Sequence, residues 1–227
     1  MGTETGTNAG ASPTTGTEGL RERKKRLMRQ QLTDTATQLF LDRGFDAVRV
    51  SEIAEACGVS EKTVFNYFPT KESLLLDRWD GTMGALRAAL AEPGIPPVQA
   101  TLQVLASELS ALTSWLDVAP DPGAAVAQIQ RFGALIQSTP SLRAHRHDLA
   151  DEVVAVAAEL LAERAGLDPQ DPEPQIAATA LLGLWQIHYR ALRKYADGSR
   201  TPAELRAAVT AQVRRAARLL DDGLGSF

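Results

Sequence analysis

Residues 60–68 carry side chains that could read the edges of DNA bases. On a helical wheel, with successive residues about 100° apart, four polar side chains of this segment gather on one side. Asn66 can form two hydrogen bonds with adenine, Lys62 can donate to guanine, and the methyl group of Thr63 can contact thymine. Tyr67, near the end of the segment, is better placed to contact a backbone phosphate. The spacing therefore predicts a short helix with a DNA-reading face.

A second short helix is predicted directly before this one, over residues 51–57, with Ser51 as its N-cap. Gly58 forms a tight turn, and Ser60 caps the helix that follows. The residues of that helix expected to face inward are Val64, Phe65 and Phe68. Two short helices joined by a glycine turn are typical of a helix-turn-helix motif, whose second helix enters the major groove. An amphipathic helix whose outer face only contacts solvent gives the same pattern. The residues that flank the motif are therefore needed to distinguish a DNA-reading helix from such a helix.

Basic residues flank this motif where phosphate contacts would fix its position on DNA. Lys71 is expected in the first turn of a fourth helix, where free backbone N–H groups and the helix dipole favour a phosphate. Arg49 lies just before the first short helix, and a basic run from Arg21 to Arg29, which includes Lys24 and Lys25, opens the first predicted helix. Residues 20–78 carry a net charge of +2, although the whole chain carries −4. The residues expected to contact DNA are Arg49, Ser60, Lys62, Thr63, Asn66, Tyr67, Lys71, Lys24 and Lys25.

The composition of the 227-residue chain indicates an all-α fold. Alanine and leucine together supply 65 residues, whereas valine and isoleucine supply 19, and this balance favours helices over strands. Apolar side chains at helical spacing, with Gly and Pro between the segments, predict about nine helices and no strand. The predicted helices span residues 21–43, 51–57, 60–68, 70 to about 91, 97–117, 123–137, 140–165, 173–196 and 202–221. Residues 1–19 are rich in Gly and Thr and are expected to form a disordered tail.

Residue types that support catalysis or metal binding are few and poorly spaced. Cys57 is the only cysteine, which excludes an internal disulfide and a cysteine-based zinc cluster. His145 and His147 lie two positions apart, and on a helix such side chains point about 160° apart. The sequence therefore predicts no enzyme activity, no cofactor and no metal site. With no apolar run of the ~20 residues that span a bilayer and no secretory signal, a cytoplasmic protein without a membrane partner is expected.

In residues 25–76 the sequence resembles the TetR family of transcriptional regulators. The similar segments are ATQLFLDRGFDAV, VSEIAEACGVS and KTVFNYFPTKESLL. The family pattern has a Thr, a hydrophobic residue, an aromatic residue, any residue, an aromatic residue and Phe, followed by K-[ED]-x-L. The matching residues are Thr63, Val64, Phe65, Tyr67, Phe68, Lys71, Glu72 and Leu74. Arg49 departs from the family, whose members commonly have Thr or Ser there to cap the next helix or touch phosphate.

This resemblance implies that residues 20–78 form the DNA-binding domain, with the fourth helix continuing to about residue 91. Residues 92–227 are expected to form a helical ligand-sensing and dimerisation domain. In a homodimer, the predicted helices 173–196 and 202–221 pack against their copies. The apolar residues of that interface are expected to be Ile176, Ala180, Leu184, Ile187, Leu205, Val209, Val213 and Leu220. Alternatively, these residues close the core of a single subunit.

A small-molecule effector site is expected among polar or aromatic side chains on otherwise apolar helices. The candidates are Trp115, Gln128, Phe132, Gln186, His188 and Tyr189. A second group, which could receive an anionic effector or form a solvated face, consists of Arg131, Arg143, His145, Arg146 and His147. The segment FGALIQSTPSLRAHRHDL resembles a TetR subgroup linked with fatty-acyl-CoA-type ligands. An acyl-CoA-like effector is therefore one hypothesis.

Together these patterns predict a sequence-specific DNA-binding regulator, a repressor that a small-molecule effector releases from an inverted-repeat operator. The fourth helix is expected to move when the effector binds and to change the separation of the two DNA-reading helices in the dimer. Two alternatives remain open. One is a DNA-binding architectural or activating protein without an effector. The other is a protein-interaction module whose helix-turn-helix is vestigial.

Overall fold

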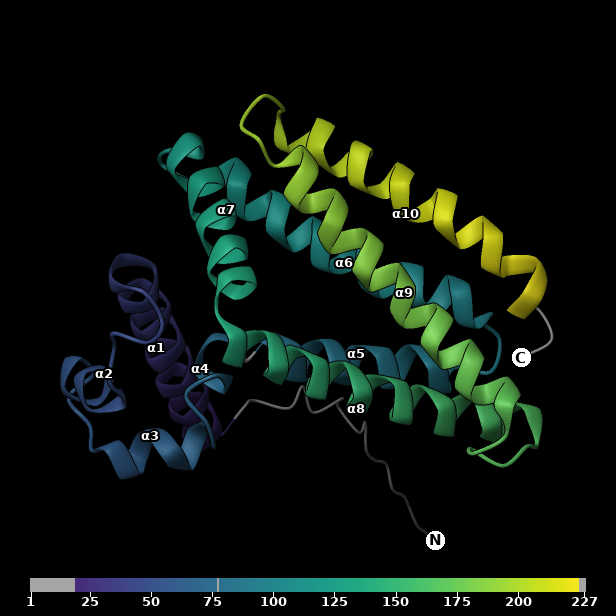
Figure 1. The fold of residues 1–227 in the computed structure, drawn as a ribbon, viewed down its shortest axis with the longest axis horizontal. Helices are drawn as coiled ribbons and strands as arrows, with labels where there is room; N and C mark the ends of the chain where they lie inside the picture. Colours follow the sequence, from purple (N-terminus) through teal and green to yellow (C-terminus); the bar gives the residue numbers. More distant parts are fainter. Residues whose placement is uncertain (1–18, 77, 225–227) are drawn as a thin grey trace, which may run out of the picture.

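A computed structural model of the protein describes residues 19–76 and 78–224, which form helices and connecting turns with no strand among them (Figure 1). The all-α fold class is confirmed. The described residues comprise ten helices, in which α4 and α5 together correspond to the predicted fourth helix, described before and after residue 77. Their bounds are α1 Leu20–Arg43, α2 Val50–Ala56, α3 Glu61–Tyr67, α4 Ser73–Leu76, α5 Arg78–Ala91, α6 Pro97–Val118, α7 Pro122–Ser138, α8 Pro140–Ala165, α9 Pro172–Tyr195 and α10 Pro202–Leu224. The predicted tail lies outside the described residues, apart from residue 19.

Proline opens each of the five helices that follow α5. The first residues of α6 to α10 are Pro97, Pro122, Pro140, Pro172 and Pro202. Proline suits this position because its fixed φ matches the helix and because the first N–H of a helix has no partner within it. The predicted starts of these helices are therefore correct to within one residue.

The N-terminal helices pack around one apolar core. Leu32, Ala36 and Phe40 of α1 are fully buried in it, at intervals of four residues that keep them on one face of the helix. The Phe40 ring packs against Phe45, with 4.8 Å between the ring centroids. Gly44 ends α1 with a φ of +85°, an angle that a residue with a side chain rarely adopts. The chain can therefore turn back at this point and bring Phe45 against α1.

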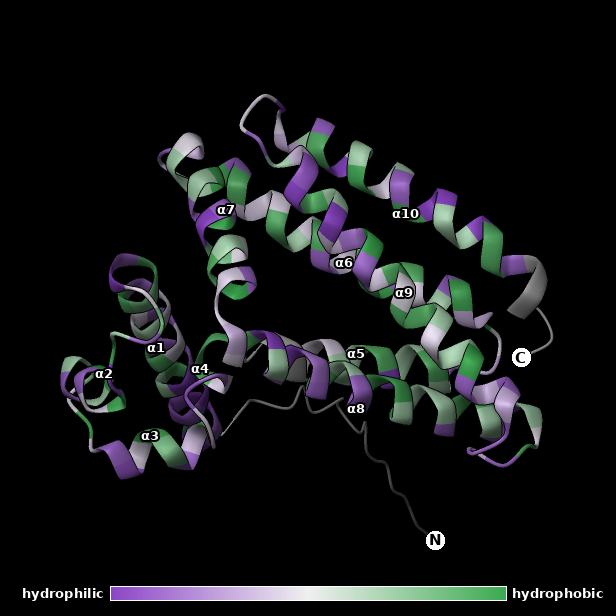
Figure 2. Cartoon of the chain, viewed as in Figure 1, coloured by the Kyte–Doolittle hydropathy of each residue, from purple (hydrophilic) through white to green (hydrophobic). Residues whose placement is uncertain are grey.

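A second and larger apolar core lies between α5, α6, α8, α9 and α10. Residues at its centre are Leu86, Leu105, Leu161, Leu181 and Val209, each at most 2% exposed. Figure 2 shows hydrophobic and hydrophilic residues alternating along these helices, as expected for helices with one buried face. The helices α9 and α10 lie side by side and antiparallel (Figure 1). Among the described residues, no helix combines the length and apolar character that crossing a bilayer requires.

The corner between α7 and α8 joins the two parts of the molecule. Ile136, near the end of α7, and Leu142, near the start of α8, are buried in the core of the N-terminal helices. Arg131 of α7 donates to the backbone carbonyl of Leu41 and to the carboxylate of Asp42 (3.3 Å), both near the end of α1. The N-terminal helices are therefore packed directly against the C-terminal part.

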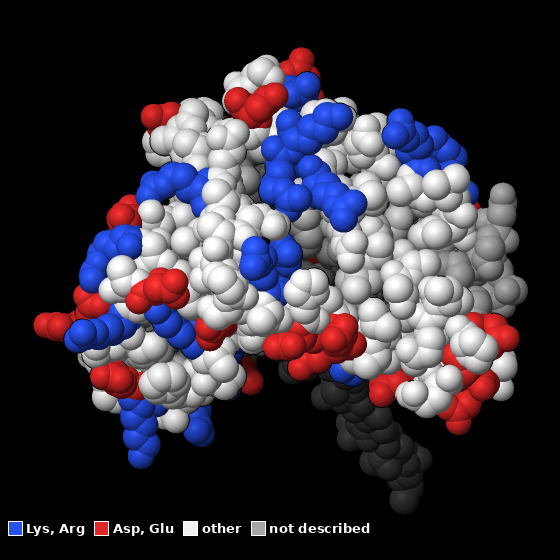
Figure 3. Space-filling model, in the orientation of Figure 1, with Lys and Arg blue, Asp and Glu red and all other residues white. Residues whose placement is uncertain are grey.

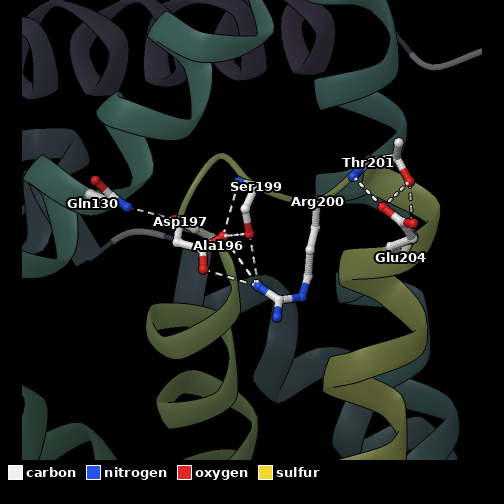
Figure 4. A network of polar contacts seen from close by, with 7 residues as sticks. All are labelled: Gln130, Ala196, Asp197, Ser199, Arg200, Thr201 and Glu204. Atoms are coloured by element: carbon white, nitrogen blue, oxygen red, sulfur yellow. Dashed lines mark hydrogen bonds and ion pairs between the residues drawn. The ribbon is translucent and has the colours of Figure 1, made fainter.

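The turn between α9 and α10 is held by a network of hydrogen bonds (Figure 4). The Asp197 carboxylate accepts from the hydroxyl and the backbone N–H of Ser199 (2.6 and 3.0 Å) and pairs with Arg200 (3.0 Å). The hydrogen bonds from Ser199, with the Arg200 pair, lower the pKa of Asp197 to about 2. The Thr201 N–H donates to the Glu204 carboxylate (2.9 Å), and the Glu204 N–H donates to the Thr201 hydroxyl (3.3 Å). This reciprocal cap fixes where α10 begins.

Half of the apolar residues assigned to a dimer interface are buried inside the subunit. These are Leu184, Leu205, Val209 and Val213, each at most 3% exposed. Their burial shows that the alternative, closure of the core of one subunit, is correct for these four positions. Ile176 is 67% exposed, and Ala180, Ile187 and Leu220 are partly exposed.

His188 of α9 is a buried ionisable group. Only 2% of the residue is exposed, and its ring packs edge-on against Tyr189, with 5.5 Å between the ring centroids. Burial disfavours the charged imidazolium and lowers the pKa of His188 from 6.5 to about 4. The side chain is therefore neutral at pH 7.

We expect the wild-type protein to lose stability, relative to a His188→Gln variant, as the pH falls from 6.5 to 4. In this range the unfolded His188 binds a proton and the folded one does not, so acid favours the unfolded state. The full shift corresponds to roughly 3 kcal/mol of unfolding free energy. Urea unfolding of both proteins at neutral and acidic pH measures the difference. The same loss in both proteins would contradict the buried, neutral state of His188.

Candidate DNA-binding surface

The helix-turn-helix consists of α2 and α3, joined by a turn at Gly58. Gly58 has a φ of +68°, and the Val59 N–H closes the turn by donating to the Ala54 carbonyl (2.9 Å). Ile53 and Ala54 of α2 are buried in the same apolar core as Val64 of α3. The turn and these buried faces fix the orientation in which α3 presents its other side.

Ser60 caps α3, as the sequence predicted. Its hydroxyl accepts a hydrogen bond from the Thr63 N–H (3.1 Å), and the two side-chain hydroxyls lie 2.9 Å apart, within hydrogen-bonding distance. Both residues were expected to contact DNA. Their hydroxyls already have partners in the helix start, and their contacts with DNA stay a prediction.

The outer face of α3 differs from the helical wheel at one position. Lys62 and Asn66 are exposed, as expected. Phe65 was assigned to the buried side, but it is 47% exposed, so that assignment is wrong. Val64 and Phe68 are fully buried and define a narrower apolar face than predicted, with Phe65 at its edge. We call Lys62, Phe65 and Asn66 the reading face.

Tyr67 and Thr63 are only partly exposed at the flank of the reading face. Tyr67 packs against the N-terminal core, and its carbonyl accepts a hydrogen bond from Arg29 of α1 (3.3 Å). The Arg29 guanidinium also lies 4.8 Å from the centroid of the Phe68 ring. Arg29, one member of the basic run in α1, therefore holds the end of α3 against α1. From the sequence only a phosphate contact was predicted for this basic run. The contact with α3 could not be predicted, because it joins segments far apart in the chain.

Arg49 is exposed and lies immediately before α2. The helix begins at Val50, so Ser51 lies inside it, and the prediction that Ser51 caps α2 is wrong. At the start of this helix the Glu52 carboxylate accepts a hydrogen bond from the Arg49 backbone N–H (2.7 Å). The same carboxylate forms an ion pair with Arg43 of α1 (2.7 Å). The hydrogen bonds from the Arg49 backbone and the Arg43 side chain lower the pKa of Glu52.

Lys71 points toward the N-terminal core. Its ammonium donates to the Phe45 carbonyl (2.6 Å) and lies 4.3 Å from the centroid of the Phe45 ring and 5.6 Å from that of Phe40. Burial lowers the pKa of Lys71, while nearby carboxylates act in the opposite direction. α4 begins at Ser73, so Lys71 precedes the helix and does not lie in its first turn as predicted. In this structure Lys71 ties the segment after α3 to the end of α1, and its phosphate contact stays a prediction.

Lys24 and Lys25 are exposed near the start of α1, together with Arg21 and Arg23. Figure 3 shows Lys and Arg side chains projecting from the lower left of the molecule, where α1 and α3 lie in Figure 1. Positive charge thus extends from the reading face along α1. A surface of this kind can bind the phosphates on either side of a groove.

The six side chains assigned to an effector site lie in different environments, and only His188 and Tyr189 are seen in contact with each other. Phe132 packs against the core of the N-terminal helices, whereas His188 is buried on α9. The other four, Trp115, Gln128, Gln186 and Tyr189, are exposed. None of the six lines either of two surface hollows, one between α8 and the start of α9 and the other along α10. The structure therefore does not support one effector site built from these residues.

Two family models match the chain. The model described as bacterial regulatory proteins, tetR family, matches residues 32–77, and the model of the MftR C-terminal domain matches residues 118–224. The first match spans the helix-turn-helix and the second spans α7 to α10.

Curated relatives are transcriptional regulators, not enzymes. TcmR, an HTH-type transcriptional regulator of Streptomyces glaucescens, is 32% identical over 153 residues, which are 67% of this chain and 67% of TcmR. The mycofactocin biosynthesis transcriptional regulator MftR of Mycobacterium tuberculosis is 25% identical over 162 residues, which are 71% of this chain and 78% of MftR. Among solved structures, Thermus thermophilus FadR, a TetR-family repressor in complex with lauroyl-CoA, is 23% identical with a TM-score of 0.49 over 86% of this chain and 94% of its own.

We expect Asn66→Ala to reduce discrimination between DNA sequences more than overall affinity. An amide that pairs with adenine contributes about 1–3 kcal/mol of discrimination, so the preference for a selected sequence over random DNA should fall by a factor of about 5 to 150. Fluorescence anisotropy with both DNAs measures this ratio. An equal loss on the two DNAs would assign Asn66 to a phosphate contact.

Phe65→Ala should weaken binding to the selected sequence with little loss of stability, because Phe65 is already 47% exposed. The matched variant Phe68→Ala removes a fully buried ring and should lower the free energy of unfolding by roughly 3–5 kcal/mol. Anisotropy measures the DNA affinity, and urea unfolding measures the stability. A folded Phe65→Ala protein with unchanged affinity would exclude Phe65 from the interface.

Proposed function

The chain belongs to the TetR family of bacterial transcriptional regulators, and we propose that it is a homodimeric repressor which a small-molecule effector releases from an inverted-repeat operator. It is a DNA-binding transcriptional regulator, and regulators of this family bind operator DNA and dimerise. The main observation in support of the proposal is that the reading face of α3 is exposed, while the opposite side of the same helix is buried in the core of the N-terminal helices. In this proposal residues 20–78 bind DNA, residues 92–227 sense the effector and dimerise, and α5 links the two.

The reading face enters the major groove of each half-site. Asn66 pairs with adenine, Lys62 donates to guanine, and the Phe65 ring contacts a thymine methyl group. The exposed lysines at the start of α1 and the Arg49 guanidinium contact phosphates. The exposure of all these side chains, together with the net charge of +2 over residues 20–78, supports this assignment.

Ser60, Thr63, Tyr67 and Lys71 act in this proposal mainly by positioning the reading face. The Ser60 and Thr63 hydroxyls bond each other at the start of α3, the Lys71 ammonium bonds the Phe45 carbonyl, and the Tyr67 backbone carbonyl accepts from Arg29. Contacts from these residues to phosphate add to that role, because an ammonium has three N–H donors and only one of the two bonded hydroxyls uses its O–H in their mutual hydrogen bond.

The dimer interface is proposed to use the outward face of α9. Ile176, Ala180, Gly183 and Ile187 lie within an arc of about 60° at 100° per residue, and Ile176 is 67% exposed. A Cβ added at Gly183 would meet nothing within 4 Å, so no neighbour in the subunit requires a glycine there. Glycine inside a helix costs about 1 kcal/mol relative to alanine. Close packing of a second copy against α9 would account for it.

The outward face of α10 supports the same interface. A shallow hollow runs along this helix, lined by the small residues Ala203, Ala207, Thr210 and Ala211, with Arg206 and Arg214 beside them. Small side chains let two helices approach closely, so α9 and α10 of one subunit can pack against α9 and α10 of the other. In this assignment Gly183 and the small residues of α10 replace the four residues found inside the core, and Ile176, Ala180 and Ile187 are kept.

The effector is proposed to act on DNA binding through α7 as well as through α4 and α5. α7 is tied to α1 by Arg131 and Ile136, and Gln130 of α7 donates to the Ala196 carbonyl at the turn before α10 (2.7 Å). A shift of α7 relative to α9 therefore moves α1 and the reading face with it. The effector weakens operator binding only by its preference for the shifted conformation.

A second candidate, a regulator without an effector, is favoured by one observation. The six side chains assigned to an effector site are scattered between the surface and the two cores. Operator binding that no small molecule alters would support this candidate over the first.

The acyl-CoA-like effector is retained as a hypothesis from the sequence. A thermal shift assay against acyl-CoAs of several chain lengths tests it, and no stabilisation at saturating concentration would remove it. We place the protein in the cytoplasm, because a bacterial regulator has to reach chromosomal DNA there.

Selection of DNA from a random library by the purified protein tests the proposed function. We expect an inverted repeat, with both halves protected in a footprint, because a two-fold symmetric dimer presents two reading faces. A single asymmetric half-site would contradict the homodimer. No enrichment of DNA at low salt would contradict this mode of DNA binding and favour the protein-interaction alternative.

Replacing both Ile176 and Gly183 by Arg should convert the dimer to a monomer, because the two charges would be buried in the interface. The molar mass from light scattering after gel filtration measures the change. The matched control Ala127→Arg places a charge on an exposed position of α7 and should leave the dimer intact. A dimer that survives both substitutions would place the interface elsewhere.

A further inference from the structure

Three arginines converge on Gln137, the penultimate residue of α7. In the amide orientation that satisfies its neighbours, the Gln137 side-chain oxygen accepts from Arg146 Nη1 of α8 (3.1 Å) and from Arg193 Nη1 of α9 (3.3 Å). Arg143 Nη1, one turn before Arg146, donates to the Gln137 backbone carbonyl (3.2 Å). We propose that Arg146 and Arg193, bridged by Gln137 and flanked by Arg143, form a binding site for a small oxyanion, either a carboxylate or a phosphate.

The charges of this arginine cluster (Arg143, Arg146 and Arg193) are not balanced. Among the described residues, no carboxylate lies within ion-pair distance of any of the three guanidiniums. Two of them share a single neutral acceptor and are thereby held close together. Like charges this close repel each other, and the repulsion is relieved when an anion lies between them.

The geometry suits an oxyanion because a guanidinium presents several N–H donors in one plane. One amide oxygen occupies only one donor of Arg146 and one of Arg193, whereas a carboxylate or phosphate accepts two parallel hydrogen bonds from each such fork. Arg146 is only partly exposed, which reduces screening by solvent. Figure 3 shows Lys and Arg side chains gathered over the C-terminal half of α9, with more of them toward the start of α8.

The cluster replaces the basic group that the sequence suggested for an anion. Arg131 of that group is engaged with Leu41 and Asp42 at the end of α1, and it therefore belongs to the joint between α7 and α1. Arg193, which completes the cluster, lies on a different predicted helix and was not a candidate. Only the packing of α7, α8 and α9 brings it to Arg146.

The site also lies next to the joint between the two parts of the molecule. Gln137 directly follows Ile136, which is buried in the core of the N-terminal helices, and Leu142 of the same core precedes Arg143. An anion that draws α8 and α9 around the end of α7 therefore acts on the corner that holds α1. If the proposed function holds, the arginine cluster identifies the effector, or its charged end, as an organic or inorganic anion; this inference rests on the proposed function.

Calorimetric titration of the full-length protein tests the site directly, with pyrophosphate as the phosphate probe and succinate as the carboxylate probe, at ionic strength matched with NaCl. We expect at least one probe to bind and, at about a hundredfold excess over Kd, to raise the Tm by about 5–10 °C. Arg146→Ala combined with Arg193→Ala should weaken that binding at least tenfold. The matched control Arg215→Ala, an exposed arginine on α10, should leave it unchanged.

Gln137→Glu provides a second, charge-based test. The new carboxylate would lie between Arg146 and Arg193, so the variant should have a higher Tm than the wild type without added anion and should no longer bind the probe. Binding of pyrophosphate alone or of succinate alone supports the site and identifies its chemistry. Absence of binding by both probes, or binding that the Arg146/Arg193 double variant retains, overturns it.

Operator release is measured separately, by anisotropy of labelled operator DNA in the presence of each probe. Binding of a probe without release supports the anion site and counts against its role as an effector site. Release by an uncharged molecule, with no binding of either anion, overturns the site and leaves the proposed function standing.

Discussion

The burial of Ile136 and Leu142 in the core of the N-terminal helices is the interaction on which the rest of the structure depends. A domain of about 60 residues has a small core and is marginally stable alone, so apolar residues supplied from elsewhere matter to it. Here they come from the corner between α7 and α8. The same contact that completes the core also prevents the DNA-binding helices from moving independently of the C-terminal part.

Within the N-terminal part, the other helices contact α3 on its inner side and at its end, so its outer side stays available for DNA. Arg29 holds the end of α3, and Lys71 holds the segment that follows it against α1. These two basic residues thus stabilise the packing of the N-terminal helices, while Lys62 and the lysines at the start of α1 remain exposed. The pairing of Glu52 with Arg43 likewise joins α2 to α1. Preorganisation of this kind means that little ordering is needed when DNA binds.

The charge distribution describes two separate basic regions in a chain whose net charge is −4. One extends over α1 and the reading face, where phosphate contacts are proposed. The other is the arginine cluster around Gln137, where three helices meet. Gln137 adjoins the buried Ile136, so the second region lies at the joint through which the effector is proposed to act on the first. The net charge of the chain reveals neither region, since it sums over groups that are far apart.

The family and most of the helices, although not the start of α2 or of α4, could be predicted from the sequence, because both depend on residues close together in the chain. Proline at a helix start and the Ser60 cap act within a few residues, and the motif from Thr63 to Leu74 is a local pattern as well. The exposure of Phe65 and the burial of Leu184 within the subunit depend on how the helices pack, and no local pattern predicted them. The meeting of Arg193 with Arg146 depends on the same packing. Periodicity shows that a helix has an apolar face, but what covers that face depends on segments distant in the chain, whose packing no local pattern encodes.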